Sequence, residues 1–184
     1  DSVIPKLNGM KNIVFIITMT LLLLGFCGCT DEVIDYNDPD VDLFVKQLKD
    51  GSYKTKGPDG YIEVPKFTRE DIPKLLTYAD DLTIIPSFPL PPVCTYFGTK
   101  VRLGECMLWI VESIRLGQYA SLGCKMVYAD ATNYEGIYFL SNEEVHDAAK
   151  RYRFWWENSQ YPQTQWTITP CYNDPLCGSG YRWW

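Results

Sequence analysis

The chain has 184 residues, of which 46% are hydrophobic, 15% aromatic and 22% charged, and its formal net charge is −6 at pH 7. This length fits one domain, and the hydrophobic content argues against intrinsic disorder. The acidic balance argues against nucleic acid as a partner, because binding phosphates requires a clustered basic surface, and against electrostatic attachment to anionic lipid.

The N-terminal region predicts a targeting signal instead of folded structure. Met10 begins a short basic region, and the twelve residues from Ile13 to Leu24 are apolar except for two threonines. As a helix they would span about 18 Å, well short of the ~30 Å hydrocarbon core of a bilayer. We therefore expect a signal peptide at residues 10–28, preceded by an upstream extension at residues 1–9.

Two cysteines end this hydrophobic stretch, and one of them is expected to start the mature chain. Phe26-Cys27-Gly28-Cys29 resembles a bacterial lipobox, in which a small residue precedes the lipidated cysteine. Cys29 fits, because Gly28 precedes it, whereas Cys27 follows a bulky phenylalanine. We expect lipidation at Cys29 and attachment to the membrane through this N-terminal lipid. The alternative is a secreted signal peptide with incidental cysteines.

Residues 29–42 are acidic, with six carboxylates and no lysine or arginine. Like charges extend such a segment, so it predicts a tether. Thr30-Asp31-Glu32 is similar to the export signal of lipoproteins moved to the outer face of the outer membrane. The expected location is therefore the outer membrane, with the body exposed at the cell surface.

The aspartates that begin at Asp38 open like a calcium-binding loop, but this interpretation fails. Leu43 and Lys49 stand where such a loop requires glycine and glutamate. No zinc, nucleotide or catalytic-serine motif is present either. The single histidine, His146, is expected to be a solvated helix residue. We therefore expect no metal and no cofactor, and we favour a protein that is not an enzyme.

Residues 43–184 predict a single compact, mainly helical domain with a few short strands and an irregular C-terminal tail. Apolar spacing and capping residues predict helices at 41–49, 68–80, 103–118 and 141–158. The second and third of these could form a HEAT-like helical hairpin, although one pair does not make a solenoid.

The predicted helix at 103–118 is apolar nearly all round, which indicates a central, buried position. Glu105 and Glu112 lie seven residues apart and share one face of it. Paired carboxylates suggest a hydrolase, which is our third functional hypothesis. However, Arg115 lies three residues after Glu112 and predicts a buried ion pair, which more often orients packing than cleaves bonds.

Five cysteines remain beyond the proposed lipidation site. Cys171 and Cys177 flank a turn and predict a disulfide, which an envelope compartment permits. Cys106 lies within the buried helix and is expected to be a small apolar packing residue. The pairing of Cys94, Cys106 and Cys124 stays open.

Three tryptophans in the tail, Trp166, Trp183 and Trp184, lack any helical pattern. Their rings are candidates for stacking on a glycan or a peptide. The competing interpretation is that the tail folds back and buries them. Trp155 and Trp156 lie on the apolar stripe of the last predicted helix and are expected in the core.

Several stretches resemble a family of short Bacteroidetes lipoproteins that is known only as a domain of unknown function. They are Phe67 to Leu76 (FTREDIPKLL), Phe88-Pro89, Leu103 to Arg115 (LGECMLWIVESIR), and the tail motifs Asp174-Pro175-Leu176 and Gly178-Ser179-Gly180-Tyr181. The resemblance supports the envelope location and a helical body, and it implies no catalytic residues.

These observations favour a lipid-anchored cell-envelope protein that acts as a non-catalytic binding or assembly component. The alternative is a surface module that binds a glycan or peptide through the tail tryptophans. The expected partners are accordingly the membrane, through the lipid, and an envelope protein or a glycan.

Overall fold

The structure is a computed structural model that describes residues 32–91, 101–130, 139–159, 171 and 173–184. The expected signal peptide, Cys29, Cys94 and Trp166 lie outside these residues. The chain divides into two units, Asp1–Val33 and Ile34–Trp184. All described helices and strands belong to the second unit.

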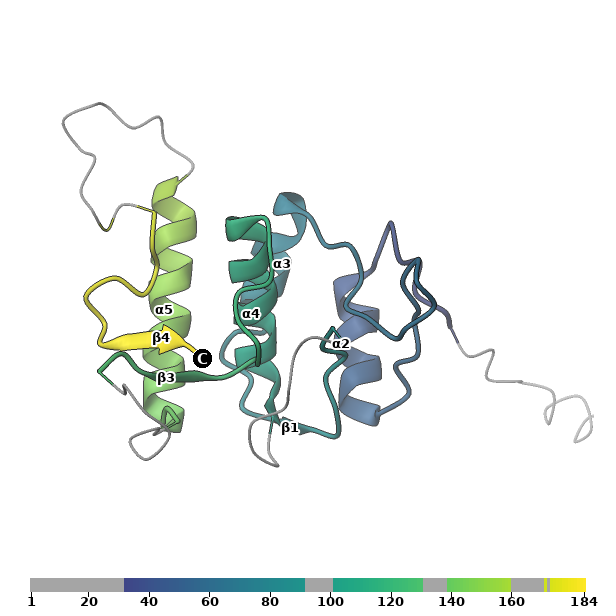
Figure 1. Cartoon of the computed structure of the whole chain (residues 1–184), viewed down its shortest axis with the longest axis horizontal. Helices are drawn as coiled ribbons and strands as arrows, with labels where there is room; N and C mark the ends of the chain where they lie inside the picture. Colours follow the sequence, from purple (N-terminus) through teal and green to yellow (C-terminus); the bar gives the residue numbers. More distant parts are fainter. Residues whose placement is uncertain (1–31, 92–100, 131–138, 160–170, 172) are drawn as a thin grey trace, which may run out of the picture. The chain divides into compact units, whose positions relative to one another are not determined.

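Helices dominate this unit, as predicted (Figure 1). They are α2 (Val41–Asp50), the 3-10 helix η1 (Arg69–Asp71), α3 (Ile72–Thr77), α4 (Leu103–Leu116) and α5 (Asn142–Ser159). Two short antiparallel pairs accompany them: β1 (Ile84–Ile85) with β2 (Val101–Arg102), and β3 (Met126–Tyr128) with β4 (Tyr181–Trp183). The mainly α fold class is confirmed.

Capping residues explain where α2 and α5 begin. The Asp40 carboxylate accepts a hydrogen bond from the Leu43 amide at 2.7 Å and starts α2. Ser141 and Glu144 exchange hydrogen bonds between side chain and backbone, so the predicted capping box at the start of α5 is confirmed. Each cap satisfies amide groups that have no partner within the helix.

Helix α4 contacts α2, α3 and α5, so it lies at the centre of the described body (Figure 1). Its apolar surface is buried nearly all round, as predicted, and Trp109 is only 1% exposed. Ile34 and Val41 also lie in the core. Packed structure therefore reaches into residues 29–42, the segment expected to be a tether.

Helices α3 and α4 approach closely at Gly104. Its amide donates to the carbonyl oxygen of Asp81 at 2.7 Å. A Cβ at this position would overlap the backbone carbonyl of Ala79. Glycine is therefore required here because backbone from the end of α3 occupies the space of a side chain.

Candidate functional site

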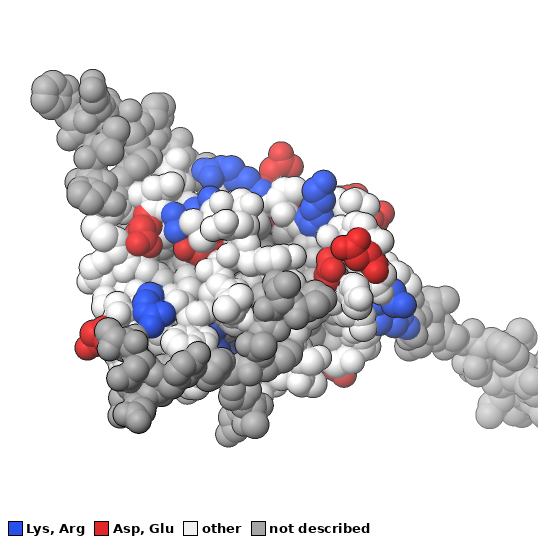
Figure 2. Space-filling view, viewed as in Figure 1, with Lys and Arg blue, Asp and Glu red and all other residues white. Residues whose placement is uncertain are grey.

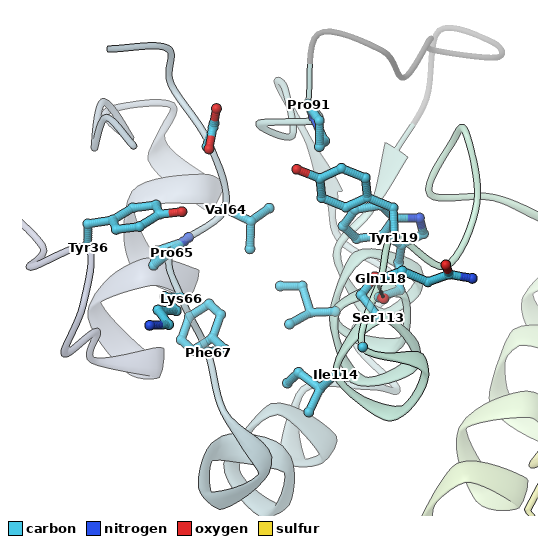
Figure 3. A pocket seen from close by; sticks show the side chains of 14 residues that line it. Tyr36, Val64, Pro65, Lys66, Phe67, Pro91, Ser113, Ile114, Gln118 and Tyr119 are labelled. Carbon is cyan, nitrogen blue, oxygen red and sulfur yellow. Dashed lines mark hydrogen bonds between the residues drawn. The ribbon is translucent and has the colours of Figure 1, made fainter. Parts of the chain in front are cut away.

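A groove with a volume of about 640 Å³ lies between an extended segment, residues 63–67, and the C-terminal half of α4 (Figure 3). One wall includes Tyr36, Val64, Pro65 and Phe67, and the facing wall includes Pro91, Ile110, Ile114 and Tyr119. This volume lies within the range of small-molecule sites. We call this cavity the α4 groove.

Hydrogen bonds and ring contacts hold the extended wall of the α4 groove in place. The Lys66 amide donates to the Tyr36 carbonyl at 2.9 Å, and the Tyr53 hydroxyl donates to the Glu63 carbonyl at 2.5 Å. The Phe67 ring meets the buried ring of Phe44 edge-on at 5.2 Å. The wall is therefore joined to the core through α2.

The opposite wall ends in an exposed aromatic ring that rests on a buried one. The Tyr119 ring stacks on Trp109 with ring centres 5.9 Å apart and 16° between the planes. Tyr119 is 53% exposed, whereas Trp109 is 1% exposed. The Trp109 indole nitrogen donates to the Ser121 hydroxyl at 3.1 Å. Tyr119 is thus an aromatic surface held in a fixed orientation.

A chain reversal places Tyr119 in this position. Gly117 adopts a left-handed conformation, with φ of 66°, and ends α4. The Ser113 hydroxyl accepts a hydrogen bond from the Ala120 amide at 3.0 Å and donates to the Trp109 carbonyl at 2.7 Å. The bond from Ala120 holds the segment after Gly117 against the helix, and the bond to Trp109 orients the Ser113 hydroxyl that accepts it.

Apolar side chains line most of the space between the two walls. Val64 and Ile114 point into the gap, while the Lys66 ammonium group turns away from it (Figure 3). Partial burial, together with the nearby carboxylates of Glu63 and Asp59, raises the pKa of Tyr36, so its hydroxyl stays protonated at neutral pH. The polar groups of the lining include those of Tyr36, Glu63, Lys66, Ser113 and Gln118.

The predicted ion pair between Glu112 and Arg115 is present, at 2.6 Å. Glu112 also accepts a hydrogen bond from the Tyr152 hydroxyl at 2.9 Å, which in turn accepts one from the Trp183 indole at 2.8 Å. The hydrogen bond to Glu112 raises the pKa of Arg115. Burial, together with the Glu112 charge, raises the pKa of Tyr152. This network connects α4, α5 and β4.

Glu105, the other carboxylate on this face, is fully buried and also paired. It lies 3.1 Å from the Lys125 ammonium and 3.3 Å from the Arg102 guanidinium, and it accepts from the Met126 amide at 3.3 Å. Glu105 and Glu112 are absent from the lining of the described cavities. The arrangement therefore offers no support for the hydrolase hypothesis.

The described tail tryptophans lie away from the α4 groove. Trp183 packs against the core, and the Arg182 guanidinium lies 5.6 Å from the centre of the Trp184 ring. The two tyrosines that line the groove, Tyr36 and Tyr119, were not among the sequence candidates. The one local signal for Tyr119 was the helix-ending Gly117 two residues before it.

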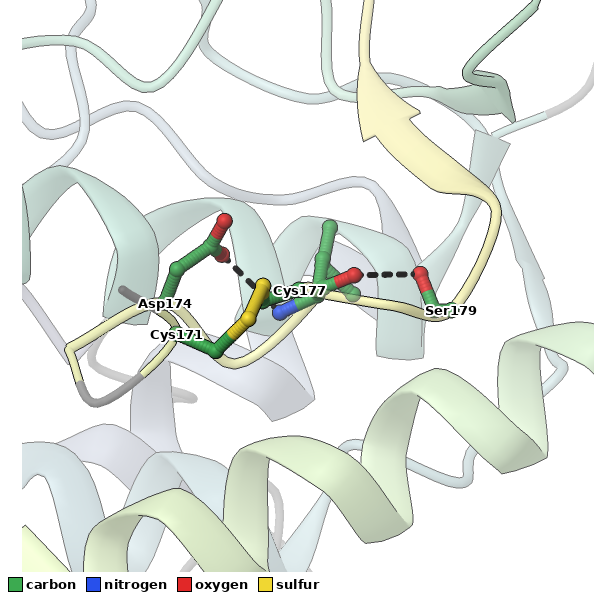
Figure 4. Close-up of a disulfide and its surroundings, with 5 residues drawn as sticks. Cys171, Asp174, Cys177 and Ser179 are labelled. Atoms are coloured by element: carbon green, nitrogen blue, oxygen red, sulfur yellow. Dashed lines mark hydrogen bonds between the residues drawn. A yellow bond between two sulfur atoms is a disulfide. The ribbon is translucent and has the colours of Figure 1, made fainter. Parts of the chain in front are cut away.

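The structure pairs Cys171 with Cys177 in a disulfide, with Cα atoms 5.3 Å apart (Figure 4). The Asp174 carboxylate accepts from the Leu176 amide at 3.0 Å, and the Ser179 hydroxyl donates to the Leu176 carbonyl at 2.6 Å. A second cavity of about 670 Å³ lies between this loop and α5.

His146 is half-exposed, and it has a partner that the sequence did not indicate. Its Nδ1 lies 3.1 Å from the Asp80 carboxylate, which also contacts Arg153 at 2.5 Å. Asp80 therefore links the turn that follows α3 to α5. Within the described residues, no cluster of three or more His, Cys, Asp or Glu side chains could hold a metal ion.

Together the fold and the groove define a mainly α domain with a partly aromatic groove and a polar network around its central helix. The chain belongs to the family described as Domain of unknown function (DUF4943), whose model matches residues 35–184. No curated protein and no solved structure matches it. None of the helices in the described ranges is long and apolar enough to cross a membrane. The lipoprotein nature and the taxon remain predictions.

Proposed function

We propose that this protein is a non-catalytic binding component of a bacterial cell envelope, anchored through a lipid on Cys29. Its expected place is the outer membrane, with the body facing the cell surface. The lipobox-like sequence and the acidic residues after it support the anchor. The α4 groove supports the binding role.

The observation that carries the binding role is Tyr119, an exposed ring stacked on the buried Trp109 at the edge of an apolar groove. A large ring held in this way makes contact at a low cost in conformational entropy. Exposed aromatic residues that line concave apolar surfaces are common in binding sites.

A peptide segment with apolar side chains suits the α4 groove better than a glycan does. Val64, Ile110 and Ile114 line the centre of the groove, and these aliphatic side chains offer no hydrogen bonds to sugar hydroxyl groups. The face shown in Figure 2 carries both signs of charge interspersed, so it has no patch of one sign that would steer a highly charged ligand. The partner would then be an envelope protein that contributes an apolar segment.

A peptide-display screen and a glycan array, both carried out with the full chain, test this proposal. We expect peptides with clustered apolar side chains to be captured, and Tyr119→Ala to weaken their binding by about tenfold, the loss expected for one well-packed contact of about 1.4 kcal/mol. Tyr61→Ala is the matched control, because Tyr61 is 60% exposed and lies outside the groove lining.

Val64→Arg places a charge in the gap and should abolish binding, while the circular dichroism spectrum stays unchanged. Capture of glycans alone would replace the peptide proposal with the glycan one. Equal peptide binding by Tyr119→Ala and Tyr61→Ala would show that the α4 groove is not the binding site.

The anchor has a separate test. Cys29→Ala should abolish incorporation of labelled fatty acid and release the protein from the membrane fraction. Cys27→Ala is the control and should leave both properties unchanged. Retention of Cys29→Ala in the membrane at the wild-type level would contradict the proposed anchor, whatever the result for the groove.

A further inference from the structure

Two buried cysteines from different segments meet in the core. Cys106 lies in α4 and Cys124 lies two residues before β3, 18 positions along the chain. Their sulfur atoms are 3.7 Å apart, and the residues are 0% and 2% exposed. Both are present as thiols in this structure.

The neighbouring residues hold these two segments in register. Glu105, which precedes Cys106, pairs with Lys125, which follows Cys124, at 3.1 Å. The Met126 amide also donates to Glu105, at 3.3 Å. Because the Glu105–Lys125 pair is itself buried, the segments cannot separate without leaving charges unpaired in the core. The sulfur atoms are therefore kept close together.

We propose that Cys106 and Cys124 are a site of oxidative modification and form a second disulfide, which joins α4 to the segment that leads into β3. A disulfide requires about 2.0 Å between the sulfur atoms. The remaining approach is small enough for side-chain rotation and a slight backbone shift to complete it. This cross-link goes beyond the proposed binding function and does not depend on it.

The reaction is a two-electron oxidation by a protein or small-molecule disulfide. One cysteine attacks the oxidant as a thiolate, which forms a mixed disulfide and releases one thiol of the oxidant. The second cysteine, also deprotonated, then displaces the other sulfur and closes the Cys106–Cys124 bond. Two protons leave the cysteines, and the oxidant is reduced to two thiols.

Burial of the two thiols determines when this oxidation can occur. Burial and the contact with Cys124 raise the pKa of Cys106 well above its ordinary value, so thiolate is scarce once the core has closed. Oxidation should therefore accompany folding or local opening of the segment before β3. Once formed, the buried bond should resist reductants that cannot reach it.

Peptide mapping of the full chain tests the proposal. Purified protein in detergent is denatured, reduced and refolded in glutathione buffers of increasing oxidised fraction. Remaining thiols are then alkylated in denaturant, and the digest is analysed by mass spectrometry. We expect a linked pair of Cys106 and Cys124 peptides beside the Cys171–Cys177 peptide. In Cys124→Ala, alkylation of Cys106 should rise from near zero to complete.

The Cys171–Cys177 pair serves as the internal control. Alkylated Cys106 and Cys124 in samples where Cys171 and Cys177 are fully linked would overturn the proposal. A link from either cysteine to Cys94 would overturn it as well. The proposal is also overturned if the Cys106 and Cys124 peptides, like the Cys171 and Cys177 peptides, stay unlinked in the most oxidising buffer.

Discussion

Glu105 shows how a charged residue can occupy the centre of this core. Its side chain is fully buried, and the Lys125 ammonium and the Arg102 guanidinium both lie within 3.3 Å. The attraction between such charges roughly offsets the cost of removing them from water, but only while all partners are present.

Glu105→Gln is therefore expected to lower the free energy of unfolding by about 3–5 kcal/mol, because it leaves the buried Lys125 without a counter-charge. Urea denaturation followed by tryptophan fluorescence measures the change. The double variant Glu105→Leu/Lys125→Met should recover much of the loss. A single variant as stable as the wild type would show that the pair is accessible to water.

At the scale of elements, the junction of α3 and α4 depends on Gly104, a residue without a side chain. Gly104→Ala should favour the helix by about 1 kcal/mol, but the added Cβ would overlap the backbone of Ala79. Since backbone cannot rotate away as a side chain can, we expect a net loss of roughly 1–3 kcal/mol in unfolding free energy.

Thermal unfolding would measure this loss. Gly60→Ala serves as the control, because a Cβ added at Gly60 would meet open space and would carry only the strain of the positive φ of 82°. A Gly104→Ala protein as stable as wild type would mean that α3 and α4 separate easily.

Asp80 makes the contact between α3 and α5 sensitive to acid. Partial burial opposes ionisation of Asp80, but hydrogen bonds from Arg153 and His146 outweigh it, so the pKa of Asp80 lies below its ordinary value of 3.8. A lowered pKa in the folded state contributes stability above pH 3.8, and this contribution is lost as the pH falls through the folded-state pKa.

Asp80→Asn should therefore lower stability at pH 7 by about 0.5–1 kcal/mol, a modest effect because the side chain is 42% exposed. The difference from wild type should shrink below about pH 4. Urea titrations from pH 7 to 3 measure it, with the exposed Asp59→Asn as control. A difference that stays constant with pH would contradict the assigned role.

The elements also show what local patterns can predict. The caps of α2 and α5 and the apolar spacing of α2, α4 and α5 are local signals, and they predict these helices to within a residue or two. The helix expected at 68–80 instead divides into η1 and α3 and ends at Thr77. Hydrogen bonds within the following turn, from Asp81 to Tyr78 and from Thr83 to Asp81, compete with a continued helix.

The α4 groove could not be predicted in this way. Its walls come from segments near positions 36, 64 and 114 that approach only in the folded chain. The Glu112–Arg115 pair was predictable because both residues lie on one helix. Their partner Tyr152 lies 40 residues from Glu112, so no local spacing connects the two residues.

Across the described body, the C-terminal tail connects elements that are distant in sequence. β4 pairs with β3, the Trp183 indole donates to Tyr152 in α5, and Arg115 in α4 donates to the carbonyl of Asn173. The described part of the tail therefore packs against the core, and its loss should weaken contacts between all of these elements.

Trp183→Ala should lower the free energy of unfolding by about 2–3 kcal/mol, because it removes packed apolar surface and leaves the Tyr152 hydroxyl without a donor. Trp184→Ala, at the neighbouring position, should cost less than half as much. Guanidinium denaturation of the two variants measures the difference. Equal losses would contradict the packing role assigned to Trp183.

The two buried carboxylates of α4 determine more than stability. Glu105 and Glu112 are two helical turns apart and face different partners, Lys125 with Arg102 and Tyr152 with Arg115. A shift of α4 by one residue would disturb its apolar packing, and it would also place both charges against hydrocarbon. We therefore expect α4 to settle in a single register, which in turn fixes where Trp109 supports Tyr119.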